Sequence, residues 1–439
     1  MTKGRFLTAH NSIARRGRTG RRIVASRHAN VKTAHPLALV LKFVAASIAV
    51  LLVSGVSLGA IATSNFASNL KTVALPGETT APALAIPTLG EFPGGFNILV
   101  VGSDRCEKVS GCKDRQGNLN DVTMLVHVAA DHKTAVAVSF PRDLVVPIPS
   151  CPKESGTGRY ASMSAQPINN TLAYGGLPCT VLTVEALTGL KIPYAAEITF
   201  SGVIAMSTAV GGVPVCISGP IRDLYSGLIL PKAGEYVLSG QDALNFLRTR
   251  HGVGDGSDLG RISSQQVFMS SLVRTIKSDK TLTDIPKLFA IATAATTHMT
   301  LSNSLANLNT MASMAMVLKG IPLESITFVQ YPGVTGQGGV YSGKVAPVKS
   351  VAAALFKRIS ADIPFTLDSG TGLGSVANPN APVAPSPTAA PSVAPTAPTT
   401  PGASPATPVP SGSPSAPSTA LDGVQGQTAA QYTCSKANN

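Results

Sequence analysis

The sequence predicts an α/β fold in which a central mixed β-sheet is flanked by helices in an α/β/α arrangement. Two observations predict it: short runs rich in β-branched residues, and longer stretches with helical periodicity that alternate with them over residues 92–366. Two further segments lie outside this domain. They are an N-terminal transmembrane helix and a disordered C-terminal tail rich in Pro and Ala.

The positive charge is concentrated at the N-terminus. The chain of 439 residues has a formal net charge of +13, but ten of its 35 Lys and Arg residues lie in residues 1–42, which contain no Asp or Glu. The remaining residues carry 25 basic and 22 acidic side chains. The globular part is therefore nearly neutral, and we expect no nucleic-acid partner.

An apolar run follows the basic segment. Residues 43–62 are 20 uncharged residues, which as a helix span about 30 Å, the thickness of the hydrocarbon core of a bilayer. We expect a transmembrane helix over 37–62, a cytoplasmic segment over 1–36 and an extracytoplasmic stalk over 63–91, since positive flanks stay inside. The alternative is a cleaved signal peptide. The predicted location is the cell membrane, with a single pass and the globular domain outside.

Alternating patterns define the elements of the domain. The apolar run in FNILVVGSD ends at Gly102 and predicts a buried strand, and further strands are expected at 124–128, 135–140 and 326–331. Helical periodicity predicts seven helices, at 179–188, 202–209, 240–248, 263–278, 285–296, 304–319 and 348–359.

The C-terminal region and the cysteines suggest an extracytoplasmic, oxidising environment. Residues 367–420 are a linker of Pro, Ala, Ser and Thr that is too polar to form a core, and 421–439 form a terminal segment. All six cysteines follow the apolar run, which favours disulfides. Loop length favours Cys106 with Cys112 and Cys151 with Cys179. Cys434 either pairs with Cys216 or stays free.

Two carboxylates follow or open predicted strands. Asp104 comes directly after the first strand, and Asp121 precedes the next. Ligands commonly bind at the carboxyl ends of strands in α/β sheets, and two converging carboxylates bind a hard cation such as Mg²⁺. The alternative is that each caps a turn or pairs with a surface arginine.

Arginines gather in two places. Arg142 follows a strand in SFPRDL, and the stretch FLRTRHGVGDGSDLGRISSQQ carries Arg248, Arg250 and Arg261. One guanidinium group can donate two parallel hydrogen bonds to the oxygens of a phosphate, and it stays positively charged. Arg248 and Arg250 share a face only in extended chain, so a helix is expected to end near Phe246. The neighbouring glycines would let the backbone approach a bulky anion. The alternative is ordinary salt bridges to the nearby aspartates.

Several stretches together resemble a known family. NILVVGSD, DVTMLVHV, VSFPRDL, INNTLAYGG and FLRTRHGVGDGSDLGRISSQQ occur in consistent order over residues 96–359. With the single apolar N-terminal run, they resemble the LytR-CpsA-Psr (LCP) family of cell-wall glycopolymer ligases. The Ala-rich and Pro-rich composition and the cysteines resemble an actinobacterial member.

The resemblance implies an LCP-like fold with a pocket for a polyprenyl pyrophosphate. It implies an enzyme, a Mg²⁺-dependent phosphotransferase that moves a glycopolymer from this lipid carrier to peptidoglycan at the membrane and releases polyprenyl phosphate. The implied magnesium ligands are Asp104 and Asp121. Arg142, Arg248, Arg250 and Arg261 would bind the pyrophosphate oxygens and, with these two carboxylates, form the catalytic set. Further candidates for binding the pyrophosphate or substrate are Arg105, Asp258 and Gln265. A homo-oligomer is left open.

Two positions depart from the family pattern. Leu119 stands where an arginine is usual two residues before the second aspartate, and Arg105 or Arg115 would take over its role. Ser264 stands where a further arginine usually precedes Gln265. Asp258 is expected to orient an arginine. Because of these departures, two alternative functions stay open: a pyrophosphatase that uses water as acceptor, and a non-catalytic wall-binding or regulatory protein.

Overall fold

The computed structural model describes most of the predicted globular domain and its C-terminal end. The described residues are 70–78, 92–105, 118–278, 281, 283–367, 370–381 and 419–438. The basic segment, the predicted transmembrane helix, most of the stalk, the pair Cys106 and Cys112, Arg115 and the bulk of the linker lie outside them. Within the described residues, no helix is both long and apolar enough to span a membrane.

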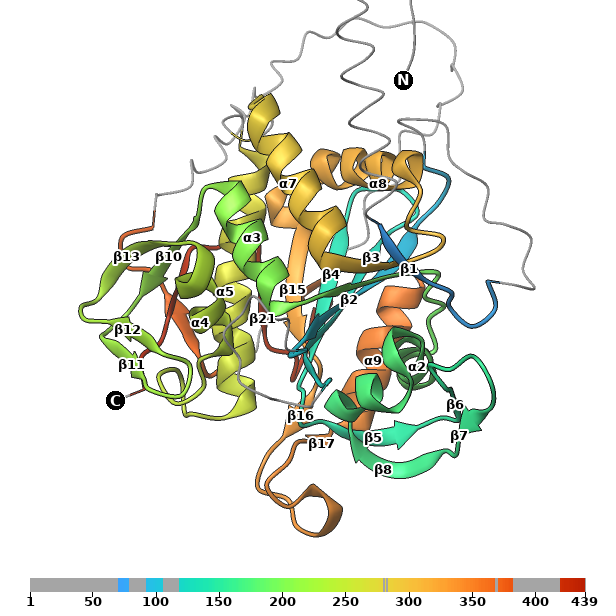
Figure 1. Ribbon diagram of the computed structural model, residues 1–439. Coiled ribbons are helices and arrows are strands. Elements are labelled where there is room, and N and C mark those ends of the chain that lie inside the picture. Colours follow the sequence, from blue (N-terminus) through green and yellow to red (C-terminus); the bar gives the residue numbers. More distant parts are fainter. Residues whose placement is uncertain are drawn as a thin grey trace, which may run out of the picture. The chain divides into compact units, whose positions relative to one another are not determined.

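An eight-stranded mixed sheet forms the centre of the domain (Figure 1). Its strands, in spatial order, are β1 (Lys71–Val73), β14 (Met299–Ser302), β9 (Tyr194–Ile198), β2 (Phe96–Ser103), β3 (Asn120–Val128), β4 (Ala135–Phe140), β15 (Ile326–Gln330) and β21 (Gly426–Thr428). In the middle of the sheet, β3 is antiparallel to both β2 and β4. On either side of these three strands the pairing is parallel, β9 with β2 and β15 with β4.

Alternation along the strands divides the core into two layers. In β2, Leu99 and Val101 join one buried cluster while Phe96 joins the other, because successive side chains of a strand point to opposite faces. Helices α2 (Thr171–Thr188) and α9 (Lys349–Ser360) cover the first face. Helix α8 (Leu308–Gly320) and part of α5 (Asp258–Lys277) cover the second. The predicted α/β fold with helices flanking a central sheet is therefore observed.

A second, smaller sheet includes the C-terminal end of the chain. Its order is β13 (Gly234–Leu238), β10 (Val213–Ile217), β22 (Thr433–Ser435) and β19 (Ser375–Ala377). We call residues 419–438 the C-terminal strap. The strap places Cys434 opposite Cys216 in the parallel pair of β10 and β22, and the two form a disulfide. In Figure 1 the red C-terminal segment ends near β11.

A second disulfide lies at the other side of the domain. Cys151 of β6 (Cys151–Pro152) bonds to Cys179 of α2, with Cα atoms 5.1 Å apart. The bond joins the short β6 hairpin to α2 close to its kink, where Gly175 and Gly176 leave helical geometry. The suggested pairs Cys151 with Cys179 and Cys216 with Cys434 are therefore both present, while the third suggested pair lies outside the described residues.

The remaining helices lie close to the predicted positions. Helix α4 (Gly240–Arg248) has the predicted bounds, whereas α2 and α5 begin earlier than predicted. The other two are α3 (Phe200–Val210) and α7 (Ile285–His298). The strands β9, β10 and β14 were not predicted. Each has only four or five residues, so the window is too short for alternation to distinguish a strand from a loop.

Candidate functional site

Three strand ends bring the first candidate residues to one edge of the central sheet. Ser103 at the end of β2 pairs with Asn120 at the start of β3, and Thr123 pairs with Phe140 at the end of β4. The candidate residues lie next to these pairs: Asp104 follows Ser103, Asp121 follows Asn120, and Arg142 comes two residues after Phe140. Antiparallel pairing therefore gathers residues from three separate sequence motifs at a single edge.

The carboxylate of Asp104 is held by the loop that leads into β3. Its Oδ1 accepts a hydrogen bond from the Leu119 amide at 2.7 Å, and its own amide donates to the Leu119 carbonyl at 3.0 Å. Leu119 thereby fixes the orientation of Asp104 through backbone atoms. This backbone role does not depend on the side chain at position 119.

The second set of residues comes from the junction between α4 and α5. Arg248 is the last residue of α4, and the chain turns extended at Thr249, which presents Arg250. Periodicity predicted this end at Arg248, whereas the spacing of the two arginines suggested an end near Phe246, which is two residues too early. Both arginines line the same cavity. Ser257 caps the N-terminus of α5 by accepting from the Gly260 amide at 3.1 Å, and Arg261 lies in the first turn of α5.

These residues line one cavity of about 360 Å³. All six residues predicted as catalytic contribute to its wall, together with Leu119 and four residues that were not predicted. The full lining is Asp104, Leu119, Asp121, Arg142, Asp223, Tyr225, Ser226, Arg248, Arg250, His251 and Arg261.

Ion pairs hold the arginines in place. Arg142 donates from Nη1 to Asp121 Oδ1 at 2.8 Å. Arg261 Nη2 lies 2.6 Å from Asp258 Oδ1 and donates to the backbone carbonyl of Asp121 at 3.1 Å. The contact with Asp258 is close enough for an ion pair but is not aligned as a hydrogen bond, since both Asp258 oxygens lack a hydrogen-bond donor among the described residues. Asp258 thus orients an arginine, as expected.

Asp143 is a further carboxylate that connects these cations. It is buried and lies 3.5 Å from Arg250 Nη2 and 3.1 Å from the Lys344 amine. It directly follows Arg142 in the motif SFPRDL, and this position next to a candidate arginine could have identified it from the sequence. Arg250 lines the cavity and Asp143 does not, so this contact positions Arg250 from outside the cavity wall.

The guanidinium groups retain unused hydrogen-bonding capacity. The Nε atoms of Arg142, Arg250 and Arg261 are buried and have no hydrogen-bond partner among the described residues, although Arg142 Nε lies 3.8 Å from Asp143 and 3.9 Å from Asp258. Burial opposes the charge of Arg142, but the carboxylates of Asp121, Asp143 and Asp258 raise its pKa. Burial, followed by the charge of Arg142, lowers the pKa of Arg250, and a guanidinium stays protonated in proteins even so. Buried, charged groups with unmade hydrogen bonds suit an anion with several oxygens.

Asp223 is a carboxylate of the cavity wall that no sequence motif identified. It is buried and accepts hydrogen bonds from the Thr249 hydroxyl at 2.6 Å and from the Arg250 amide at 3.0 Å. Burial alone would raise its pKa, but hydrogen bonds from Thr249, Arg250, Ser226 and Tyr225 hold the pKa of Asp223 below its ordinary value. Asp223 therefore fixes the extended turn that presents Arg250.

Three of the predicted residues, Arg105, Asp258 and Gln265, are not among those that line the cavity. Arg105 is exposed, and its amide donates to Ser103 Oγ. Gln265 is buried and donates from Nε2 to the Leu247 carbonyl at 2.8 Å, which ties α5 to the end of α4. Gln265 thus supports the segment that carries Arg248.

The C-terminal strap supports the same loop from its outer side. The Gly254 amide donates to Lys436 O at 2.8 Å, and Asn438 donates from Nδ2 to His251 O at 3.0 Å. The glycine-rich loop packs closely against the chain itself: a Cβ at Gly254 would lie 3.0 Å from Gly260 Cα. A Cβ at Gly252 would lie 2.7 Å from the Ile221 side chain, and one at Gly256 would lie 3.4 Å from Asn438 Nδ2. The expectation that these glycines admit an anion is corrected, because what approaches them closely is the protein's own chain.

Magnesium was expected at this site. Asp104 and Asp121 line the same cavity, and Mg²⁺ in proteins is commonly held by one or two carboxylates together with phosphate oxygens of the substrate. The chemistry of the two carboxylates therefore fits this ion. No group of three or more His, Cys, Asp or Glu side chains placed to hold a metal occurs among the described residues.

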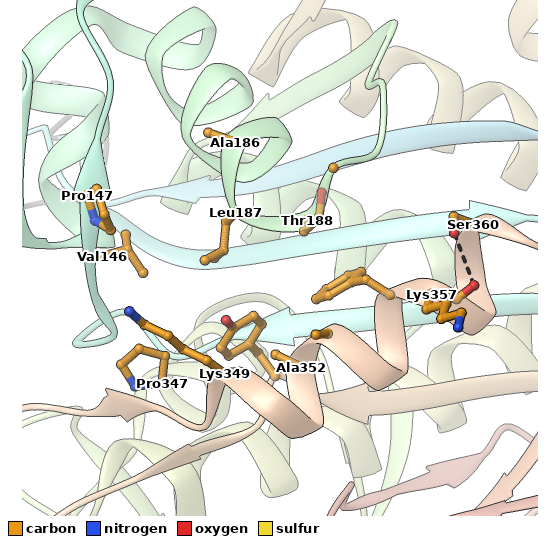
Figure 2. Close-up of a pocket in the computed structure, with 14 residues that line it drawn as sticks. Val146, Pro147, Ala186, Leu187, Thr188, Pro347, Lys349, Ala352, Lys357 and Ser360 are labelled. Carbon is orange, nitrogen blue, oxygen red and sulfur yellow. Dashed lines mark hydrogen bonds between the residues drawn. The ribbon is translucent and has the colours of Figure 1, made fainter.

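A second cavity is larger, about 750 Å³, but it lacks this chemistry (Figure 2). Lys349, Ala352 and Lys357 of α9 face Ala186, Leu187 and Thr188 at the end of α2 across it. No arginine or carboxylate lines it. Size alone therefore does not identify the functional site, and the smaller cavity, with its converging charges, is the candidate.

Comparisons with known proteins agree with the sequence motifs. The LytR_cpsA_psr family model matches residues 65–357. The chain is 30% identical over 282 residues to the cell wall biosynthesis protein LcpA of Corynebacterium glutamicum, covering 58% of this chain and 53% of LcpA. It is also 30% identical over 256 residues to the polyisoprenyl-teichoic acid–peptidoglycan teichoic acid transferase TagT of Bacillus subtilis, covering 56% of this chain and 72% of TagT.

The LytR-Csp2A-Psr enzyme from Actinomyces oris superposes with a TM-score of 0.48 at 22% identity, covering 66% of this chain and 95% of that one. The chain spans about half the length of LcpA. The matched region contains every residue that lines the charged cavity.

Proposed function

The chain belongs to the LytR-CpsA-Psr family, and on that basis we propose that it transfers a glycopolymer from a polyprenyl-pyrophosphate carrier to peptidoglycan. The name of the relative TagT describes a transfer of this kind, from a polyisoprenyl carrier to peptidoglycan. The observation that carries the proposal is the cavity in which Arg142, Arg248, Arg250 and Arg261 converge with Asp104 and Asp121.

The arrangement suits phosphoryl transfer because this reaction requires mainly positioning and neutralisation of charge. An acceptor hydroxyl of the wall attacks the phosphorus that bears the glycan. The bond from this phosphorus to the bridging oxygen breaks, polyprenyl phosphate leaves, and a phosphodiester joins glycan and wall. The hydroxyl proton passes to a carboxylate, Asp104 or Asp121. The arginines hold the phosphate oxygens throughout.

Arg248 has a fixed position for this role. Its guanidinium lies over the ring of Phe200 in α3, 4.6 Å from the ring centroid. This cation–π contact restrains the guanidinium at the wall of the cavity that it lines. Arg248 would therefore meet the pyrophosphate without having to reorganise.

Magnesium is part of the proposal. Asp104 and Asp121 would hold it, and the ion would neutralise charge on the pyrophosphate oxygens when bound. The proposed location is the outer face of the cell membrane, with residues 43–62 as the anchor. The proposed partners are the lipid-linked glycan and peptidoglycan. Assembly into a homo-oligomer is left open.

Transfer in vitro tests the proposal directly. Full-length protein in detergent is incubated with Mg²⁺, a polyprenyl-pyrophosphate glycan and peptidoglycan, and the glycan covalently attached to the wall is measured. Arg250→Ala is expected to lower transfer by about a hundredfold, because charge-assisted hydrogen bonds to the reacting phosphates are lost. Arg222→Ala, an exposed arginine on β11 (Ile221–Asp223), is the matched control and should leave transfer unchanged.

The products distinguish the alternatives. Attached glycan supports the transferase, whereas free glycan phosphate with no attachment would identify a pyrophosphatase. Binding of the lipid-linked glycan without turnover would identify a binding protein. Equal rates for wild type and Arg250→Ala would contradict the assigned role of the cavity.

A further inference from the structure

An exposed aromatic residue stands at the mouth of the charged cavity. The hairpin of β11 and β12 (Leu228–Leu230) carries Leu224 and Tyr225 at its tip, and their exposed fractions are 73% and 84%. Tyr225 also lines the cavity. The ring therefore offers most of its surface to solvent while it borders the site, a placement that contributes little to the stability of the fold.

The tip of this hairpin is fixed relative to the arginines. Asp223 Oδ1 accepts hydrogen bonds from the amides of Tyr225 at 2.9 Å and Ser226 at 3.3 Å. Its other oxygen accepts from Thr249 and Arg250. One buried carboxylate thus binds both the hairpin tip and the turn that presents Arg250, so Tyr225 is positioned by the same group as the anion-binding arginine.

A second ring extends the aromatic surface. The His251 ring lies 4.7 Å from that of Tyr225, centroid to centroid, with 43° between their planes. His251 lines the cavity too, and its backbone carbonyl is held by Asn438 of the C-terminal strap at 3.0 Å. Two rings from different elements therefore form a preorganised apolar surface beside a polar site.

We infer that Tyr225 and His251 form a binding surface for a sugar ring of the acceptor glycan. One face of a pyranose ring carries C–H groups and packs on the negative face of an aromatic ring, while its hydroxyls remain available to polar groups. Burial decides for the acceptor. The Arg261 side chain, 3% exposed, marks the deep end of the cavity where a pyrophosphate would lie, and Tyr225 marks the open end where a wall strand arrives.

The inference rests on the proposed function, and its test uses direct binding. Full-length protein in detergent is titrated calorimetrically with a soluble glycan fragment of alternating N-acetylglucosamine and N-acetylmuramic acid, and separately with inorganic pyrophosphate. Tyr225→Ala is expected to weaken fragment binding about tenfold, while Tyr225→Phe keeps it. Pyrophosphate binding should be unchanged in both. Tyr160→Ala, an exposed tyrosine that does not line this cavity, is the matched control.

Two outcomes would overturn the inference: equal fragment binding by wild type and Tyr225→Ala, or an equal loss in Tyr225→Phe and Tyr225→Ala. A loss of pyrophosphate binding in Tyr225→Ala would also overturn it, because the ring would then serve the donor. The transfer assay separates this inference from the proposed function. Fragment binding that depends on Tyr225 without any transfer refutes the function alone, whereas transfer with fragment binding independent of Tyr225 refutes the surface alone.

Discussion

Ser264 and Ser435 meet through their hydroxyl oxygens at 2.6 Å in the buried interior, although they lie 171 positions apart in the chain. Ser264 belongs to α5 and also donates to the carbonyl of Gly374 at 3.2 Å, while Ser435 belongs to the C-terminal strap. The position where the family pattern leads one to expect an arginine is therefore a packed contact with the chain's own C-terminal strap. A long side chain at position 264 would displace the C-terminal strap from α5.

The first prediction concerns the two departures from the family pattern. Ser264→Arg is expected to lower the free energy of unfolding by about 3 kcal/mol or more, because it overpacks the interior and buries an unpaired charge. Leu119→Arg is the matched comparison, since Leu119 lines the cavity. It should leave stability nearly unchanged and tighten pyrophosphate binding. Urea unfolding and calorimetry measure both, and equal destabilisation by the two substitutions would contradict this account.

The second prediction concerns the disulfide between Cys216 and Cys434, which closes a loop of 218 residues. Replacing both cysteines with serine should cost about 2–5 kcal/mol and should weaken pyrophosphate binding, because the C-terminal strap holds the loop at His251 and Gly254.

Amide hydrogen exchange of residues 251–256 should then become faster. The control is the double serine variant of Cys151 and Cys179, a disulfide remote from this loop. It should lose stability without faster exchange at 251–256. Unchanged exchange after loss of the Cys216 bond would show that the C-terminal strap does not support the loop.

The third prediction follows from the lowered pKa of Asp223. Its carboxylate is stabilised in the folded state, so this contribution is complete at pH values well above 3.8, the ordinary value, and is lost as the pH falls through the lower folded-state pKa. Asp223→Asn should destabilise the protein by about 1–3 kcal/mol at neutral pH, because amide donors would face the side-chain NH₂.

The difference in stability between wild type and Asp223→Asn should shrink as the pH is lowered below 3.8. Urea unfolding at several pH values measures it. A difference that stays constant between neutral pH and pH values below the ordinary value would show that the ionised form of Asp223 is not the one that the fold stabilises.

The fourth prediction concerns magnesium. Chelation with EDTA should abolish transfer, and added Mg²⁺ should restore it. Asp104→Asn and Asp121→Asn should each raise the Mg²⁺ concentration needed for half-maximal transfer by about tenfold or more, because each removes a charged oxygen ligand. Asp242→Asn, an exposed aspartate in the first turn of α4, is the control. Transfer that persists after chelation would remove magnesium from the proposed mechanism.

Much of the site was predictable because its residues follow local signals. Asp104 and Arg142 come directly after strands with clear β-branched patterns, and three cavity arginines share one charged stretch with Asp258. Short apolar runs rich in β-branched residues located β2 and β4, and helical periodicity located α4 with its observed bounds. Periodicity was therefore sufficient to predict the fold class, and local side-chain chemistry marked six residues of the cavity wall as candidates, whereas the family followed from the resemblance of several motifs.

The tertiary structure decided which distant groups support that wall. Asp223 reaches Arg250 from 27 positions away, and the C-terminal strap reaches Ser264 across 171. Neither contact follows from periodicity, because backbone hydrogen bonds and side-chain packing between distant segments depend on the register of the completed sheets. The sequence by itself determined where the charges lie along the chain. Only the fold determined that Gln265 faces Leu247, that Ser264 meets the strap, and that Tyr225 stands beside His251 at the mouth of the cavity.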